Sequence, residues 1–127
     1  MACSDKPNVQ RAVARPGDRC QVWLENCSPA YLHSGRILIV HANGQSHTGN
    51  VLESDLDQGA PFTYVYRPGE FFSISLLFDP VTGPGKQAEV HARVITSDGA
   101  ERDRWCTRIV SGTPAPDTVS FALKGAQ

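Results

Sequence analysis

Cysteine is the residue type whose chemistry is most constrained by spacing in this chain of 127 residues. The four cysteines are Cys3, Cys20, Cys27 and Cys106. An even number in a short chain rich in Pro and Gly is typical of disulfides and of an oxidising compartment. There is no C-x-x-C motif, and no histidine stands at ligand spacing from a cysteine pair, so a zinc site is not predicted. Reduced, buried thiols are the alternative.

The stretch CQVWLENC restricts how these cysteines can pair. If it forms one strand, Cys20 and Cys27 lie about 23 Å apart at ~3.3 Å per residue, whereas a disulfide needs Cα atoms within roughly 7 Å. Alternation turns Cys27 away from the apolar side of its strand, and it does the same to Cys106 in DRWCTRIV. We therefore predict a Cys27–Cys106 disulfide, with Cys20 either bonded to Cys3 or left as a buried thiol.

Motifs that resemble catalytic loops fail on their spacing. GQSHTG has its second glycine one place too late for a nucleophile elbow, and a hairpin is expected around Ser46 where that motif needs a helix. GPGK lacks the first glycine and the Ser/Thr of a phosphate-binding loop. No strand or loop brings together a nucleophile, a base and an orienting group. The chain is therefore predicted not to be an enzyme, and no cofactor is predicted.

Carboxylates and histidines give two patterns that could concern a metal. Asp55 and Asp57 in ESDLDQG are candidate Ca²⁺ ligands, although the spacing of a calcium-binding hand is missing and a solvated polar loop is the alternative. His41 and His47 flank an Asn-Gly pair, which predicts a two-residue type I′ hairpin. That register puts the two imidazoles on opposite sides of the sheet, so they are not predicted to share a metal. His91 is predicted to be solvated.

These side chains are positioned by short strands, which the sequence indicates as runs of alternating apolar and polar residues separated by turn residues. Nine strands are predicted, over residues 8–15, 19–25, 36–42, 45–53, 61–67, 70–79, 87–96, 102–110 and 117–124, and no helix is predicted. Gly, Pro, Asp or Asn stands in every intervening segment. This pattern predicts an all-β, immunoglobulin-like β-sandwich of antiparallel strands in a single domain, 1–127, with flexible ends at 1–7 and 124–127. A closed β-barrel is the alternative.

Alternation also predicts where the tryptophan of CQVWLENC points. One side of that strand is apolar and belongs to the core: Cys20, Val22 and Leu24. Trp23 stands on the other side, between two polar residues, and is predicted to face outward as a binding residue.

An aromatic platform is the second candidate binding feature. If the strands of PFTYVYRPGEFFSISLLF pair around the Pro-Gly, one side holds Val65 and Phe72 in the core. The other side then gathers the aromatic residues Phe62, Tyr64, Tyr66 and Phe71 beside serines. Tyrosine suits interfaces because it supplies contact area and a hydroxyl group. Two alternatives remain: the tyrosines pack under loops, or a bulge at the turn exchanges the two sides.

Composition limits the partners. The formal net charge is −1, with 12 Lys and Arg against 13 Asp and Glu and no long run of one sign, so neither nucleic acid nor anionic lipid is predicted as a partner. No apolar run is long enough for a membrane span, and no signal peptide is predicted. Cys3 after Ala2 is a candidate lipid anchor, which would leave one cysteine unmatched.

The function predicted from these features is that of a non-enzymatic binding domain outside the cytoplasm. The location is the periplasm, the cell surface or the medium, and the partner is another protein. A surface lipoprotein, an inhibitor or immunity-type protein, and a component of a secretion or adhesion assembly all fit. A carbohydrate-binding module assisted by Ca²⁺ is the alternative.

Overall fold

A computed structural model describes residues 9–27, 32–78, 87–110 and 117–125. In order, its elements are β1 (Val9–Ala14), β2 (Arg19–Glu25), β3 (Leu32–Val40), β4 (Ser46–Asn50), η1 (Glu53–Leu56), β5 (Phe62–Val65), β6 (Phe71–Phe78), β7 (Gln87–Ile95), β8 (Glu101–Val110) and β9 (Asp117–Gly125). Each predicted strand corresponds to one of these strands, and the short 3₁₀ helix η1 was not predicted. Lys124 and Gly125 belong to β9 rather than to a flexible end, and residues 1–7 lie outside the described residues.

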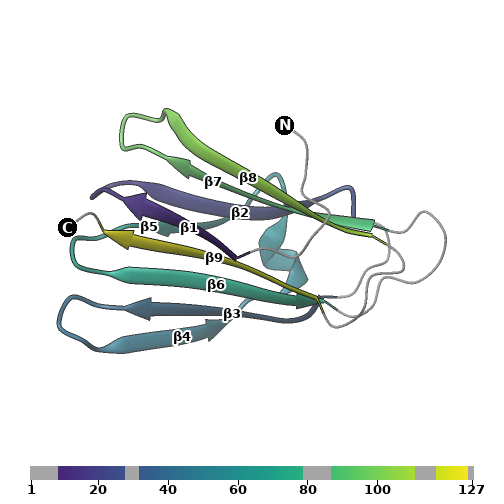
Figure 1. Cartoon of the computed structure of the whole chain (residues 1–127), viewed down its shortest axis with the longest axis horizontal. Helices are drawn as coiled ribbons and strands as arrows, with labels where there is room; N and C mark the ends of the chain where they lie inside the picture. The colour runs from purple at the N-terminus through teal and green to yellow at the C-terminus, as the bar shows by residue number, and fades with distance from the viewer. Residues whose placement is uncertain (1–8, 28–31, 79–86, 111–116, 126–127) are drawn as a thin grey trace.

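The strands form two sheets that face each other. The larger sheet has the order β1-β9-β6-β3-β4, and the smaller has the order β5-β2-β7-β8. All strands run along the long axis of the molecule (Figure 1). Both sheets have open edges, so the predicted β-sandwich is confirmed and the barrel alternative is wrong. The strand pairs are antiparallel except β1 with β9, which is parallel.

The core lies between the sheets and follows the two-residue period of the strands. In β6 every second side chain is fully buried, from Phe72 to Phe78. The inward residues of β7 and β9 oppose it from the two sheets: Ala88, Val90, Ala92 and Val94, and Val119, Phe121 and Leu123. Trp105 packs against Phe121 with ring centroids 6.2 Å apart, which places the predicted inner side of β8 in the core.

The β3–β4 hairpin differs from its prediction by one residue. The His41 N–H donates to the Gln45 carbonyl at 2.7 Å, and Gly44 takes a φ of +87°, so the loop is one residue longer than a type I′ turn. This is the bulged hairpin in which a glycine takes the left-handed position. His47 consequently stands opposite Ile39. The two histidines therefore lie on the same side of the sheet, and the prediction that they lie on opposite sides is wrong.

The Pro-Gly segment is a connection between the two sheets. Glu70 N–H donates to the Arg67 carbonyl at 3.1 Å, and Gly69 has a φ of +79°, as in a type II turn with proline before glycine. A turn of this type splays the strands that it joins. Strand β5 accordingly pairs with β2, and β6 pairs with β3 and β9. The predicted pairing of these two strands is wrong.

Candidate functional site

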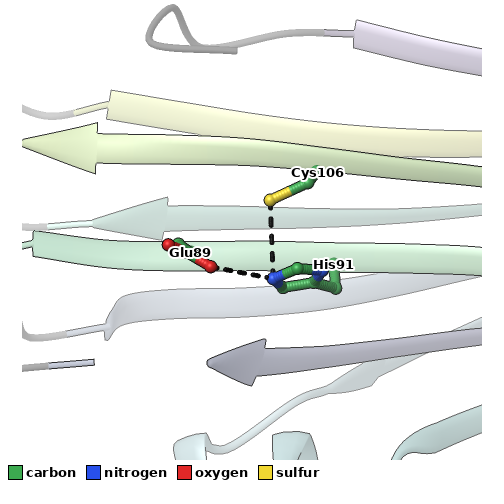
Figure 2. A group of neighbouring side chains, drawn as sticks. All are labelled: Glu89, His91 and Cys106. Carbon is green, nitrogen blue, oxygen red and sulfur yellow. Dashed lines mark hydrogen bonds and ion pairs between the residues drawn. The ribbon is translucent and has the colours of Figure 1, made fainter. Parts of the chain in front are cut away.

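A cluster of polar and aromatic side chains covers the outer face of the smaller sheet. Trp23, His91 and Cys106 form one row across β2, β7 and β8. The Trp23 and His91 rings stack with centroids 5.4 Å apart. His91 Nε2 lies 3.1 Å from Glu89 Oε1, 3.2 Å from Glu25 Oε2 and 3.4 Å from Cys106 Sγ. Figure 2 shows the Glu89 carboxylate and the Cys106 sulfur pointing at the same ring nitrogen.

Trp23 occupies the predicted side of β2 but not the predicted environment. Its ring is only 4% exposed, because the guanidinium groups of Arg93 and Arg104 lie over it at 5.2 and 5.5 Å from the ring centroid. The indole N–H donates to Glu25 Oε2 at 2.8 Å. Cation–π contacts of this kind hold both arginines on the ring. The sequence-based prediction of an accessible binding tryptophan is therefore wrong about its accessibility.

The side chains of Glu89, His91 and Cys106 place ligand atoms within 4.8 Å of one another, as a metal centre would. Zinc binding requires a thiolate at such a cysteine. Cys106 Sγ, however, lies 3.4 Å from His91 Nε2, and the same nitrogen is 3.2 Å from Glu25 Oε2. The carboxylate of Glu89 is shared with Arg108, whose Nε lies 3.8 Å away. The described contacts of these three side chains are therefore those of an ion-paired cluster.

Burial is what distinguishes this cluster from ordinary surface pairs. His91 is 9% exposed, so the prediction that it is solvated is wrong. Burial is the largest single influence and raises the pKa of Glu89, but hydrogen bonds with His91 and Asn26 together with the charges of His91 and Arg108 outweigh it and lower the pKa overall. Glu89 is therefore held as a carboxylate.

The cysteine pairing in the structure differs from the predicted one. Strand β7 separates β2 from β8, and strands two places apart lie roughly 9.6 Å from each other, beyond the ~7 Å limit for disulfide Cα atoms. Cys27 is exposed just past the end of β2, where Asn26 turns the chain with a φ of +47°, and it is not bonded to Cys106. Cys20 is a buried thiol, the second of its two predicted states. Burial raises its pKa to about 12. Cys3 lies outside the described residues.

A second imidazole–carboxylate pair lies at the β3–β4 loop. Glu70 is buried and accepts hydrogen bonds from the Tyr64 hydroxyl and from His41 Nδ1, both at 2.6 Å. The Tyr64 bond is the main cause of a lowered Glu70 pKa, and burial together with this bond raises the pKa of Tyr64. These hydrogen bonds connect the β3–β4 loop to the Pro-Gly turn between β5 and β6.

The predicted aromatic platform is not a surface. Tyr64 and Tyr66 are 7% and 3% exposed and belong to the core, where Tyr64 stacks on Phe72 at 4.3 Å. Phe62 is half-buried against the same core. Val65, which was assigned to the core, is 49% exposed. The two sides of β5 are exchanged because β5 joins the smaller sheet. Phe71 alone keeps its outward position, on β6 and half-buried.

The candidate calcium ligands stabilise turns. Asp55 Oδ2 accepts the Leu52 N–H at 2.8 Å at the start of η1, and Asp57 Oδ1 accepts the Gly59 N–H at 2.7 Å. Such bonds are the ordinary local role of aspartate in loops. They support the polar-loop alternative.

An open cleft of about 910 Å³ separates the end of β2 from η1. Carboxylates from both sides line it, namely Glu25, Glu53 and Asp57, together with Cys27. Glu25, which lines the cleft, also lies 3.2 Å from His91 Nε2, so the cleft borders the polar cluster on the outer face of the smaller sheet.

The outer face of the larger sheet carries charge of one sign. We call it the cationic face. The register of the strands defines its residues: Arg11, Val13, Ser34, Arg36, Leu38, Val40, Ser46, Thr48, Asn50, Phe71, Ser73, Ser75, Leu77, Thr118, Ser120, Ala122 and Lys124. It holds three basic residues and no carboxylate among the described side chains.

The side chains of the cationic face interact little with one another. Ser75 and Ser120 share a hydrogen bond of 3.0 Å between their hydroxyl oxygens. Arg11, Arg36 and Lys124 are exposed, and none of them forms an ion pair within the described residues. Half-buried apolar side chains share the face with the cations: Leu38, Val40, Phe71 and Leu77. The face is therefore partly apolar, and its basic side chains have no ionic partner among the described residues.

Sequence reasoning missed this face for an identifiable reason. The alternation of TVSFALK assigns Ser120, Ala122 and Lys124 to the outer side of the last strand, and that signal was available. No local sequence pattern, however, shows which strands lie beside the last strand in the sheet. Only the register joins Lys124 to Phe71 and Arg36 to Ser75 in one surface.

Comparison of the chain with known proteins found no match among protein-family models, curated proteins or solved structures. No described helix is long and apolar enough to cross a membrane.

Proposed function

We propose that the protein is a non-enzymatic binding domain that engages another protein through the cationic face. The observation that carries the proposal is the charge of that face: Arg11, Arg36 and Lys124 stand among apolar and hydroxyl side chains, with no carboxylate among the described residues of the face. Arginine beside apolar side chains is a composition that protein interfaces favour.

Charge complementarity favours an acidic partner. Cations on a surface steer an oppositely charged partner and repel a like-charged one. Two copies of this chain packed face to face would bring Arg36 and Lys124 of both copies together with no described carboxylate between them. The partner is therefore a protein whose contact surface carries Asp or Glu around apolar residues.

The proposal keeps an extracytoplasmic location. The even number of cysteines in a short chain rich in Pro and Gly supports it, because this composition is typical of proteins in oxidising compartments. A surface-attached protein, an inhibitor and a secretion component all remain compatible with the cationic face. The carbohydrate alternative finds no support, because sugar rings stack on accessible aromatic faces and Trp23 and Tyr66 are buried.

The test compares the same charge reversal on the two faces. Arg36→Glu alters the cationic face, and Arg19→Glu makes the same change in net charge on the smaller sheet. The wild type and both variants are immobilised and exposed to an extract of the cells that produce the protein. We expect a protein that the wild type and Arg19→Glu retain and that Arg36→Glu binds about tenfold more weakly, with the difference shrinking at high salt.

Two results would contradict the proposal. One is equal retention of every captured protein by the two charge variants, since the cationic face would then not be the contact. The other is stronger binding of the wild type to vesicles of phosphatidylcholine with phosphatidylglycerol than to any captured protein. That result would assign the face to an anionic membrane instead.

A further inference from the structure

One edge of the cationic face ends in the strand β4, which is open to pairing. β4 is the last strand of the larger sheet and pairs only with β3 among the described strands. It lies at the lower margin of the molecule, with no labelled strand beyond it (Figure 1). The side chains of Ser46, Thr48 and Asn50 are exposed on this strand.

Two hydrogen bonds fix which backbone groups of β4 point outward. The His41 N–H donates to the Gln45 carbonyl, and the Val51 N–H donates to the Gly35 carbonyl at 2.9 Å. In an antiparallel ladder, residues that bond to the partner strand alternate with residues that do not. Positions 45, 47, 49 and 51 therefore bond to β3. Ser46, Thr48 and Asn50 direct their N–H and C=O groups to the open edge.

The other edges of the two sheets carry features that discourage pairing. β8 includes charged side chains along much of its length, among them Glu101, Arg102, Asp103 and Arg104. β5 is only 4 residues long and stands between Pro61 and Pro68. β1 carries Arg11 and is followed closely by Pro16. Charge, proline and short length are the usual protections of edge strands.

β4 contains no Asp, Glu, Lys, Arg or Pro, and at 5 residues it is one residue longer than β5. Its sequence is SHTGN, and its hairpin loop is held by the contact between His41 and Glu70. An exposed, uncharged edge strand is a template to which an extended segment can add. The strand is thus held in place while its outer backbone groups remain available.

We propose that an extended, acidic segment of the partner protein adds to β4 as a sixth strand of the larger sheet. This inference rests on the proposed function, because it uses the same partner and extends the cationic face by one strand. Side chains of the added strand would alternate, and those on the outer side would continue the rows of Ser46, Thr48 and Asn50. Arg36 stands beside Asn50, one strand in, where its long side chain can reach a glutamate on the added strand.

A second copy of this chain is a poorer occupant. Pairing β4 with β4 would join two cationic faces into one continuous sheet, with Arg36 of each copy one strand away from the junction. No described carboxylate stands on that face to offset the repulsion. An acidic strand removes this cost.

The first test selects dodecapeptides from a random phage-displayed library on the wild type and compares two variants at one position. Thr48→Pro removes an outward N–H without removing a bond to β3, since proline is tolerated where that N–H faces solvent. Thr48→Ala keeps the N–H and removes the side chain. We expect acidic peptides that bind Thr48→Pro about tenfold or more weakly and Thr48→Ala within about threefold.

The second test does not depend on the proline variant being folded. Single N-methyl groups are placed along a selected peptide, and losses of binding are expected at every second residue, the period of a strand that bonds on one edge. In hydrogen exchange followed by NMR, the peptide should protect the amides of Thr48 and Asn50 and leave those of β8 unchanged.

The outcomes separate the two proposals. If Arg36→Glu loses the peptides while Thr48→Pro retains them, the cationic face binds but strand addition is wrong. If neither variant loses them, both proposals are wrong, and failure to select any peptide counts against strand addition. Protection of Thr48 that rises with protein concentration alone would make a second copy the occupant and overturn the inference.

Discussion

The two outer faces of the sandwich treat their charges in opposite ways. On the smaller sheet, His91 lies between Glu25 and Glu89, and arginines from β7 and β8 lie over Trp23. On the larger sheet, Arg36 and Lys124 have no ionic partner within the described residues. The charged groups on the smaller sheet are therefore paired with one another, whereas those on the larger sheet have no partner among the described residues.

The difference shows why an outward position is a poor guide to function. Trp23 points away from the core yet is almost inaccessible, because cross-strand neighbours can cover a side chain as completely as a second sheet does. The cationic face has no tryptophan or tyrosine among its described residues, yet it is accessible. An aromatic side chain indicates binding only where its neighbours leave it exposed.

Truncation of one aromatic ring on each face is the strongest test of this contrast. Trp23→Ala removes a ring that is packed against His91 and two arginines, and we expect unfolding to become easier by about 3 kcal/mol, as for a core aromatic. Phe71→Ala on the cationic face should cost less than about half of that, because the ring is half-buried. Urea titration measures both. Similar costs for the two variants would show that the faces are packed alike.

Glu89→Gln tests whether the charge pairing of the smaller sheet stabilises the fold. The variant leaves His91 and Arg108 with a neutral partner in a buried place, so we expect a loss of about 1–3 kcal/mol at neutral pH. Glu53→Gln, in the exposed loop of η1, is the control and should change the free energy of unfolding by less than about 0.5 kcal/mol.

The same charge pairing predicts the direction in which stability changes with pH. The pKa of Glu89 is lower in the folded protein than its ordinary value of 4.5, so its contribution is complete above that value and is lost as the pH falls through the lowered pKa. The stability of the wild type should therefore fall more steeply than that of Glu89→Gln between about pH 5 and pH 3. Glu70, whose pKa is also lowered, acts in the same direction and remains in both proteins. If the stability of the two proteins falls in parallel with pH, Glu89 does not contribute to the pH dependence.

The number and placing of strands could be predicted because both depend on local signals. Gly, Pro and Asp mark the turns, and two-residue alternation marks the buried side of β2, β7 and β9. These patterns involve residues that are adjacent in sequence. The core could therefore be largely assigned before any strand was paired with another.

What could not be predicted depends on which strands become neighbours. A proline followed by glycine is compatible with a hairpin and with a connection between sheets, and the second choice turned Tyr64 and Tyr66 inward. The burial of His91 requires Trp23 from β2 and Cys106 from β8 on either side of it. The cationic face likewise exists only through the register. Each of these is a long-range consequence of topology.

The smallest expected effect, from alanine at one arginine of each face, separates the faces most directly. Arg93→Ala removes a hydrogen bond to Gln21 at 2.8 Å and a contact with Trp23, which together should cost about 1–2 kcal/mol. Arg36→Ala removes no bond within the described residues and should change the free energy of unfolding by less than about 0.5 kcal/mol. An equal loss of stability in the two variants would mean that Arg36 has an interaction partner inside the chain and is not available to another protein. If Arg36→Ala leaves the free energy of unfolding unchanged but weakens capture of the partner, this arginine contributes to binding and not to stability. That result is expected for a charge without an ionic partner among the described residues.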